Sequence, residues 1–175
     1  MRELPAAIEV RQARSPDIET VIALLEGEIE RYREWAPEDW RPAGPTPELR
    51  ERLNPLYEDD ERAWILLAFD GDEAIGVVSL STVTGADARV PPEGTIYLWQ
   101  MFVRRDWHGR GLAGPLLDRL VDEVRRRGYR RIVLWTPAGA AQARRFYERE
   151  GFTFTGEEDP ESSFGLPLVQ YGRDL

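Results

Sequence analysis

The feature that most constrains this chain is a glycine-rich turn between a strand-like run and a helix-like run. Residues 95–103 read Thr-Ile-Tyr-Leu-Trp-Gln-Met-Phe-Val, which predicts a buried strand. Three glycines follow between His108 and Gly114, and leucines at helical spacing begin at once. Glycine lets the backbone approach a ligand closely, and the first turn of a helix carries free N–H groups that attract anions. The sequence therefore predicts a phosphate-binding join between a strand and a helix.

Two known signatures fit this loop. Residues 108–113, His-Gly-Arg-Gly-Leu-Ala, resemble the acyl-CoA signature Gln/Arg-x-x-Gly-x-Gly/Ala of the GCN5-related N-acetyltransferases, with His108 at the first position. Gly109-x-Gly111-x-x-Gly114 also spells the dinucleotide fingerprint of Rossmann domains. A Rossmann domain needs an acidic residue about 20 positions later and several further strand-helix units. The next predicted strand, residues 130–136, ends without an acid, so dinucleotide binding is a remote alternative, as is a loop that only turns a corner.

A second motif lies at residues 140–152 and resembles the family's Asn-x-x-Ala-x-x-Phe-Tyr-x-x-x-Gly-Phe. Ala140 stands where the family often has an Asn that bonds the pantetheine arm, so one cofactor contact is expected to be missing. The resemblance implies that Tyr147 is a general acid, which protonates the coenzyme A thiolate as it leaves. The alternative is that Phe146 and Tyr147 are only buried aromatics of an amphipathic helix.

Bulk composition excludes several classes of function. The chain has 175 residues, 42% of them apolar, and is predicted to form one domain over residues 1–175. It has no cysteine and one histidine, which excludes disulfides and makes a metal site unexpected. The net charge of −9 argues against nucleic-acid binding. Neither a signal peptide nor a membrane span is evident. All basic residues are arginine, which indicates a GC-rich bacterial genome, and a cytoplasmic location is expected.

Hydrophobic periodicity, together with capping and turn residues, predicts the order of the helices and strands. A first helix is expected to start within residues 15–18, with Ser15 as its cap and Pro16 at its first position. Further helices are predicted at residues 47–57, 112–127 and 140–150. Strands are predicted at residues 8–13, 64–69, 74–84, 95–103, 130–136, 152–155 and 168–173, with an acidic loop at 157–161. This order resembles the acetyltransferase family from end to end. The resemblance implies an α/β (α+β) fold, with about four helices flanking a mixed, mostly antiparallel sheet of about seven strands that is splayed at its centre.

The resemblance also implies the ligands and their contacts. Acetyl-CoA is expected as acyl donor, with no metal. The residues expected to bind it are those of the strand end and the loop: Met101, Phe102, Val103, His108, Gly109, Arg110, Gly111, Leu112, Ala113 and Gly114. The residues expected to bind the acceptor are Tyr32, Trp35, Tyr97 and Gln100. Acids lie among aromatics on the acceptor side, which suits a cationic amine, although a solvated acidic surface is an equally good interpretation. The acids are Glu28, Glu34, Glu38 and Asp39 near the first helices and Glu157, Glu158, Asp159 and Glu161 in the later loop.

No convincing general base is evident. Some relatives carry a Glu on the strand six residues before Val103, and that position here is Tyr97. Gln100 and Glu93 are considered, and ordered water can also remove the proton. The predicted function is transfer of an acetyl group from acetyl-CoA to a primary amine of a small molecule or peptide by direct attack. A catalytically silent acyl-CoA binding or sensing module is the alternative, and a homodimer is possible by analogy with the family.

Overall fold

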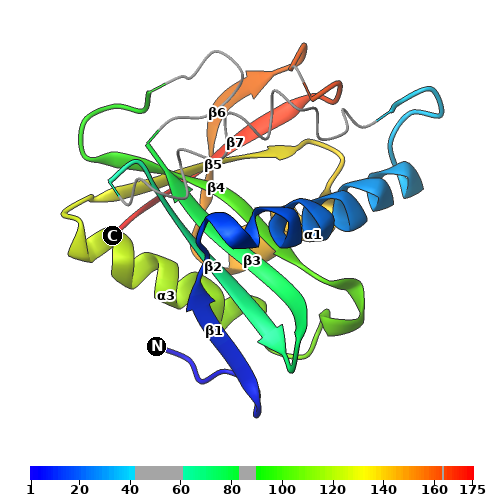
Figure 1. Ribbon diagram of the computed structural model, residues 1–175. Coiled ribbons are helices and arrows are strands. Elements are labelled where there is room, and N and C mark those ends of the chain that lie inside the picture. Colours follow the sequence, from blue (N-terminus) through cyan, green and yellow to red (C-terminus); the bar gives the residue numbers. More distant parts are fainter. Residues whose placement is uncertain (42–60, 83–89, 163) are drawn as a thin grey trace.

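The computed structural model describes residues 1–41, 61–82, 90–162 and 164–175 (Figure 1). A seven-stranded sheet has the order β1-β2-β3-β4-β5-β7-β6, and only the β4–β5 pair is parallel. The strands are β1 (Ile8–Gln12), β2 (Ala63–Asp70), β3 (Glu73–Ser81), β4 (Thr95–Val103), β5 (Arg131–Pro137), β6 (Thr153–Asp159) and β7 (Leu168–Asp174). The helices are α1 (Ile18–Glu30), α3 (Ala113–Arg126) and α4 (Ala141–Arg149), with short 3-10 turns η1 (Ser15–Asp17), η2 (Arg31–Glu34) and η3 (Arg105–Trp107). This confirms the predicted fold class. The helix predicted at 47–57 lies outside the described residues.

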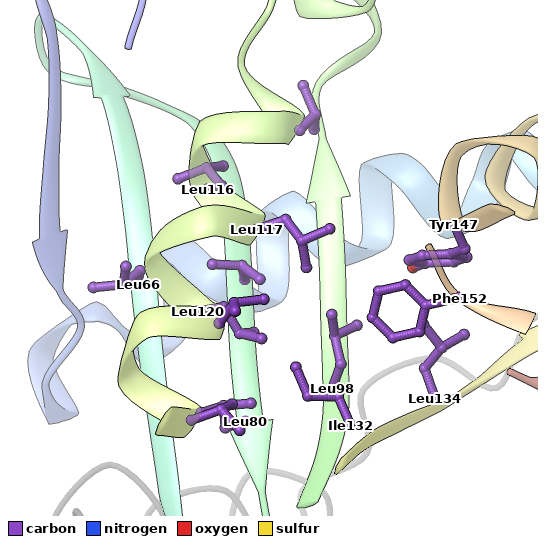
Figure 2. Packing of buried hydrophobic residues seen from close by; sticks show 14 of the residues in the cluster. Leu66, Leu80, Leu98, Leu116, Leu117, Leu120, Ile132, Leu134, Tyr147 and Phe152 are labelled. Carbon is purple, nitrogen blue, oxygen red and sulfur yellow. The ribbon is translucent and has the colours of Figure 1, made fainter. Parts of the chain in front are cut away.

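Helices cover both faces of the sheet, α1 on one and α3 on the other (Figure 1). The leucines of α3 recur at helical spacing, and Figure 2 shows Leu116, Leu117 and Leu120 pointing toward the strands. All three are at most 1% exposed. Burying one such side chain stabilises the fold by about 1.5–3 kcal/mol, so this single stripe fixes how α3 lies across the sheet. The start of α3, and with it the glycine loop, is thereby held in a fixed position.

Strand β4 is irregular at its middle. Leu80 of β3 pairs with Leu98, and Ser79 pairs with Gln100, so Trp99 is an extra residue in β4. Such a bulge bends a strand and shifts its side-chain alternation by one position. Leu98 and Met101 accordingly pack in the same cluster under α3, whereas Trp99 packs against the α1 cluster.

The same strand leaves its other neighbour after three residues. β4 pairs with β5 only at Thr95↔Arg131, Ile96↔Ile132 and Tyr97↔Val133, yet it stays paired with β3 as far as Val103. From Leu98 onward, no described strand pairs with the edge of β4 that faces β5. The expected splay at the centre of the sheet is therefore present. Main-chain donors and acceptors along this edge are available to a ligand.

Two predicted boundaries were wrong. Ser15 does not cap α1: it lies in η1, and the Asp17 carboxylate accepts the Arg14 N–H at 2.9 Å instead. Residues 157–159 are not a loop, because β6 continues to Asp159. β6 lies at one edge of the sheet, and an edge strand tolerates charged side chains that face water. The acidic composition that indicated a loop is thus compatible with a strand at this position.

The described helices are short. The longest of them, α3, has 14 residues. None of the helices in residues 1–41, 61–82, 90–162 and 164–175 is long and apolar enough to cross a membrane. Over the same residues, no three His, Cys, Asp or Glu side chains gather where they could hold a metal ion.

Candidate functional site

A cavity of about 750 Å³ opens where β4 and β5 diverge. Its walls come from the second half of β4, the glycine loop, the first turn of α3, the end of β5 and α4, and η2 also lines it. Most of the sequence-predicted cofactor residues line it: Met101, Phe102, Val103, His108, Gly109, Gly111, Leu112, Ala113 and Gly114. A volume of this size suits a small-molecule ligand. The divergence of the two strands thus creates a cavity that most of the predicted cofactor residues line.

The glycine loop presents bare backbone to this cavity. Gly109 has φ 75° and Gly111 has φ 80°, which is the left-handed region that side chains disfavour. A Cβ placed on either glycine would meet no atom within 4 Å, so open space lies beside both. Leu112 precedes α3 and gives its first turn no side-chain cap. Uncapped N–H groups at a helix start bind anions such as phosphates.

His108 holds the loop in place. Its Nε2–H donates to the Val103 carbonyl at 2.7 Å, and its Nδ1 accepts from the Gln142 amide at 3.4 Å. The tautomer with the proton on Nε2 satisfies both contacts. The side chain at the first position of the motif therefore ties the loop to β4 and α4.

Arg2 is a member of the site that the sequence did not reveal. Its guanidinium bonds Asp118 at 2.8 Å, Glu150 at 2.7 Å and the Gly114 carbonyl at 3.1 Å, which joins the start of α3 to the end of α4. A Cβ on Gly114 would lie 2.6 Å from this guanidinium, so the third motif glycine makes room for Arg2. The hydrogen bond from Arg2 lowers the pKa of Asp118 to about 2. No local pattern marks Arg2, because its partners are more than 100 positions away.

Tyr147 lies in α4 and lines the cavity. It is 7% exposed, and its ring packs edge-on against Phe146 at 5.5 Å and Phe152 at 5.7 Å (Figure 2). Burial raises the pKa of Tyr147, and the nearby Tyr32 raises it further. Within the described part of the chain, no residue forms a hydrogen bond with its hydroxyl. The phenol therefore keeps its proton at neutral pH and has it free to donate to a ligand.

Aromatic side chains line the end of the cavity near α1. Tyr32 and Trp35 line it, as predicted, with ring centroids 5.0 Å apart. Tyr32 also contacts Trp40 at 6.2 Å and Phe164 at 5.9 Å, so the segment after α1 meets the segment before β7. We call these four residues the aromatic wall. Burial, together with the charge of Glu28, raises the pKa of Tyr32 to about 12.

Four other candidate residues lie elsewhere. Tyr97 is 6% exposed, where β4 is still paired with β5. Gln100 is 7% exposed, and its Oε1 accepts a hydrogen bond from Ser79. Arg110 is exposed and stacks over Trp107, and Glu93 is exposed ahead of β4. None of the four lines the cavity. The structure thus brings the predicted cofactor residues together, with Arg110 as the exception, but only half of the predicted acceptor residues.

Comparisons with known proteins agree with this geometry. The model of the Acetyltransferase (GNAT) family matches residues 29–152. Mycothiol acetyltransferase of Beutenbergia cavernae is 33% identical over 106 residues, which are 61% of this chain and 33% of that protein. The chain thus spans about a third of the length of this relative.

Solved structures resemble the whole fold. PaiA N-acetyltransferase from Thermoplasma acidophilum, solved in complex with coenzyme A, has a TM-score of 0.72 at 15% identity and covers 96% of this chain and 99% of its own. An N-acetyltransferase from Staphylococcus aureus Mu50 has a TM-score of 0.73 at 20% identity, with 95% and 98% covered. At these identities, the likeness concerns the fold.

Proposed function

This chain belongs to the acetyltransferase (GNAT) family, and we propose that it transfers the acetyl group of acetyl-CoA to a primary amine of a small molecule or peptide by direct attack. The observation that carries the proposal is the cavity between β4 and β5, which combines an open glycine loop at one end with Tyr147 on its wall. A cytoplasmic location and a homodimer stay predictions.

The residues of the site fit acetyl-CoA. When bound, acetyl-CoA supplies an activated acetyl thioester. Gly109 and Gly111, with the first turn of α3, would hold its diphosphate, because their backbone borders open space. The edge of β4 from Leu98 to Phe102, which is not paired with β5, would pair with the amides of its pantetheine arm. Ala140 lines the same cavity without a polar side chain, which fits the expected loss of one contact.

Tyr147 would act as the general acid. Its buried phenol keeps the proton at neutral pH, and no described residue competes for that hydroxyl. Donation of the proton to a departing thiolate would make the sulfur a better leaving group. The N–H groups along the open edge of β4 would stabilise negative charge that develops on the acetyl oxygen.

The acceptor would enter from the end of the cavity bounded by the aromatic wall. Aromatic faces and carboxylates together favour a cation, which supports an amine acceptor. The match to mycothiol acetyltransferase adds a mycothiol precursor to the panel of acceptors to be tested, alongside polyamines, amino acids and peptides.

Release of free thiol from acetyl-CoA in the presence of this panel tests the proposal. Turnover with at least one amine supports it. Tight binding of acetyl-CoA without turnover on any acceptor would indicate a binding or sensing module instead. Calorimetry with NAD beside acetyl-CoA covers the dinucleotide alternative, because only one of the two ligands should bind.

A further inference from the structure

We infer that Glu28 binds the amino group of the acceptor and accepts a proton from it, a role that rests on the proposed acetyl transfer. Glu28 is in the last turn of α1, a helix that packs against β3 and β4. Its side chain is only 9% exposed, which is unusual for a glutamate, yet it lines the cavity that contains Tyr147. A carboxylate that is withdrawn from bulk water but borders a ligand cavity is a strong candidate for direct contact with a ligand.

The other carboxylates that line this cavity are less suited to the role. Glu34 is 55% exposed and pairs with Arg105 at 3.0 Å on the surface. Glu150 is bound by Arg2 at the opposite end, beside Gly114. Glu28 lies close to Tyr32 of the aromatic wall, since its charge contributes to the raised pKa of Tyr32, and unlike Glu34 it is withdrawn from water. Tyr32 in turn lies near Tyr147. Glu28, on α1, and Tyr147, on α4, therefore line the same cavity from different elements.

The partner of Glu28 leaves room for a ligand. Arg31 forms its ion pair with Oε2 of Glu28. The other carboxylate oxygen, Oε1, takes no part in this ion pair. The Arg31 Nε is itself buried without a hydrogen-bond partner among the described residues. Glu28 lies in a poorly hydrated place, where a carboxylate attracts an ammonium group more strongly than it does in water. The aromatic rings of Tyr32 and Trp35 would add cation–π contact to the same group.

The proton transfers of the reaction then balance. One N–H bond of the ammonium breaks, its proton goes to a Glu28 oxygen, and the electron pair stays on nitrogen. That pair forms the new C–N bond while the C–S bond breaks, and the thiolate takes a proton from the Tyr147 hydroxyl. The second proton lost by nitrogen returns to Tyr147, and Glu28 releases its proton to solvent. Each turnover yields one amide, one thiol and one free proton.

Glu28→Gln tests the inference, with Glu30→Gln as the matched control. Glu30 pairs with Arg33 as Glu28 pairs with Arg31, three positions along the same stretch, but it is 57% exposed and does not line the cavity. Both variants are assayed by thiol release with an alkylamine, which is protonated at neutral pH, and with an arylamine, which is not. We expect Glu28→Gln to lower kcat/KM for the alkylamine by about 100-fold or more and for the arylamine by less than about 5-fold. Glu30→Gln should match the wild type on both.

The affinity of Glu28→Gln for acetyl-CoA, measured by calorimetry, is the control for folding. We expect this affinity to equal that of the wild type. Glu28→Asp, which keeps the charge on a shorter arm, should recover part of the alkylamine activity. If the wild type turns over alkylamines and Glu28→Gln does so equally well, or if the arylamine suffers the same loss, the role of Glu28 is refuted. A wild type that acetylates no amine at all would instead refute the proposed function.

Discussion

The Nε2 of His108 lies 2.7 Å from the carbonyl oxygen of Val103, so the first residue of the glycine motif folds back onto the last residue of β4. Removing the ring in His108→Ala loses this hydrogen bond and the contact with Gln142, a loss of about 1 kcal/mol for each bond. We expect the dissociation constant of acetyl-CoA to rise about fivefold or more, with kcat little changed. His108→Gln keeps an amide donor and should recover much of the affinity. Calorimetry on the two variants checks this, and equal losses in both would contradict it.

Gly111→Ala tests the role of the glycine loop, with Gly128→Ala as its control. Gly128 has φ 81°, close to the 80° of Gly111, and a Cβ on either would meet no atom within 4 Å. Both variants should lose about 1–2 kcal/mol of unfolding free energy, because alanine is strained in this region. Only Gly111→Ala puts a methyl group into the cavity, so only it should weaken acetyl-CoA binding, by about tenfold. Denaturant unfolding and calorimetry separate the two effects. If both variants bound acetyl-CoA with equal affinity, the hypothesis that this loop binds the diphosphate would be wrong.

Tyr147→Phe should lower kcat by about 10²–10⁴-fold and leave acetyl-CoA affinity nearly unchanged, because it removes one proton donor and little packing. Burial raises the pKa of Tyr147 above its ordinary value of 10.0, so the phenol of the wild type stays protonated up to that pH. Loss of the Tyr147 proton should therefore cause no fall in wild-type kcat below pH 10.0. Steady-state kinetics across this range provide the measurement. A kcat for the variant within threefold of the wild type would leave Tyr147 as a packing residue only.

Asp118→Asn should destabilise the protein by about 1 kcal/mol at neutral pH, a figure reduced for the exposure of Arg2 to solvent. The hydrogen bond from Arg2 lowers the folded-state pKa of Asp118 from 3.8 to about 2. A depressed carboxyl pKa contributes stability that is complete above pH 3.8 and is lost as the pH falls through about 2. The difference between the wild type and Asp118→Asn should therefore shrink over this window. Urea unfolding at several pH values measures it, and a difference that does not change with pH would exclude ionisation as its source.

Much of the fold and of the cofactor site could be predicted because their signals are local. The leucine stripe of α3 and the three motif glycines lie within one short stretch, where helical spacing and conformational freedom determine what each residue does. The prediction that Tyr147 is the general acid depended on the family resemblance, because its ring is also an ordinary buried aromatic of the core.

The rest depended on contacts that leave no local mark. Strict alternation counted back from Phe102 would place Gln100 and Leu98 on the same face, but the bulge at Trp99 moves Leu98 to the opposite face with Met101. A one-residue shift of this kind is set by pairing with β3 and not by composition. Glu28 was one of many acidic residues in the sequence, and only its burial distinguishes it.

The early end of the β4–β5 ladder leaves backbone amides of the described strands unpaired in the middle of this sheet. In most sheets, backbone amides exchange with deuterium fastest at the rim and slowest at the centre. Here the protein keeps a seam of unpaired amides between β1–β4 on one side and β5–β7 on the other. A bound thioester would form hydrogen bonds with these unpaired amides, as an additional strand would. Binding would therefore make both halves of the sheet more rigid.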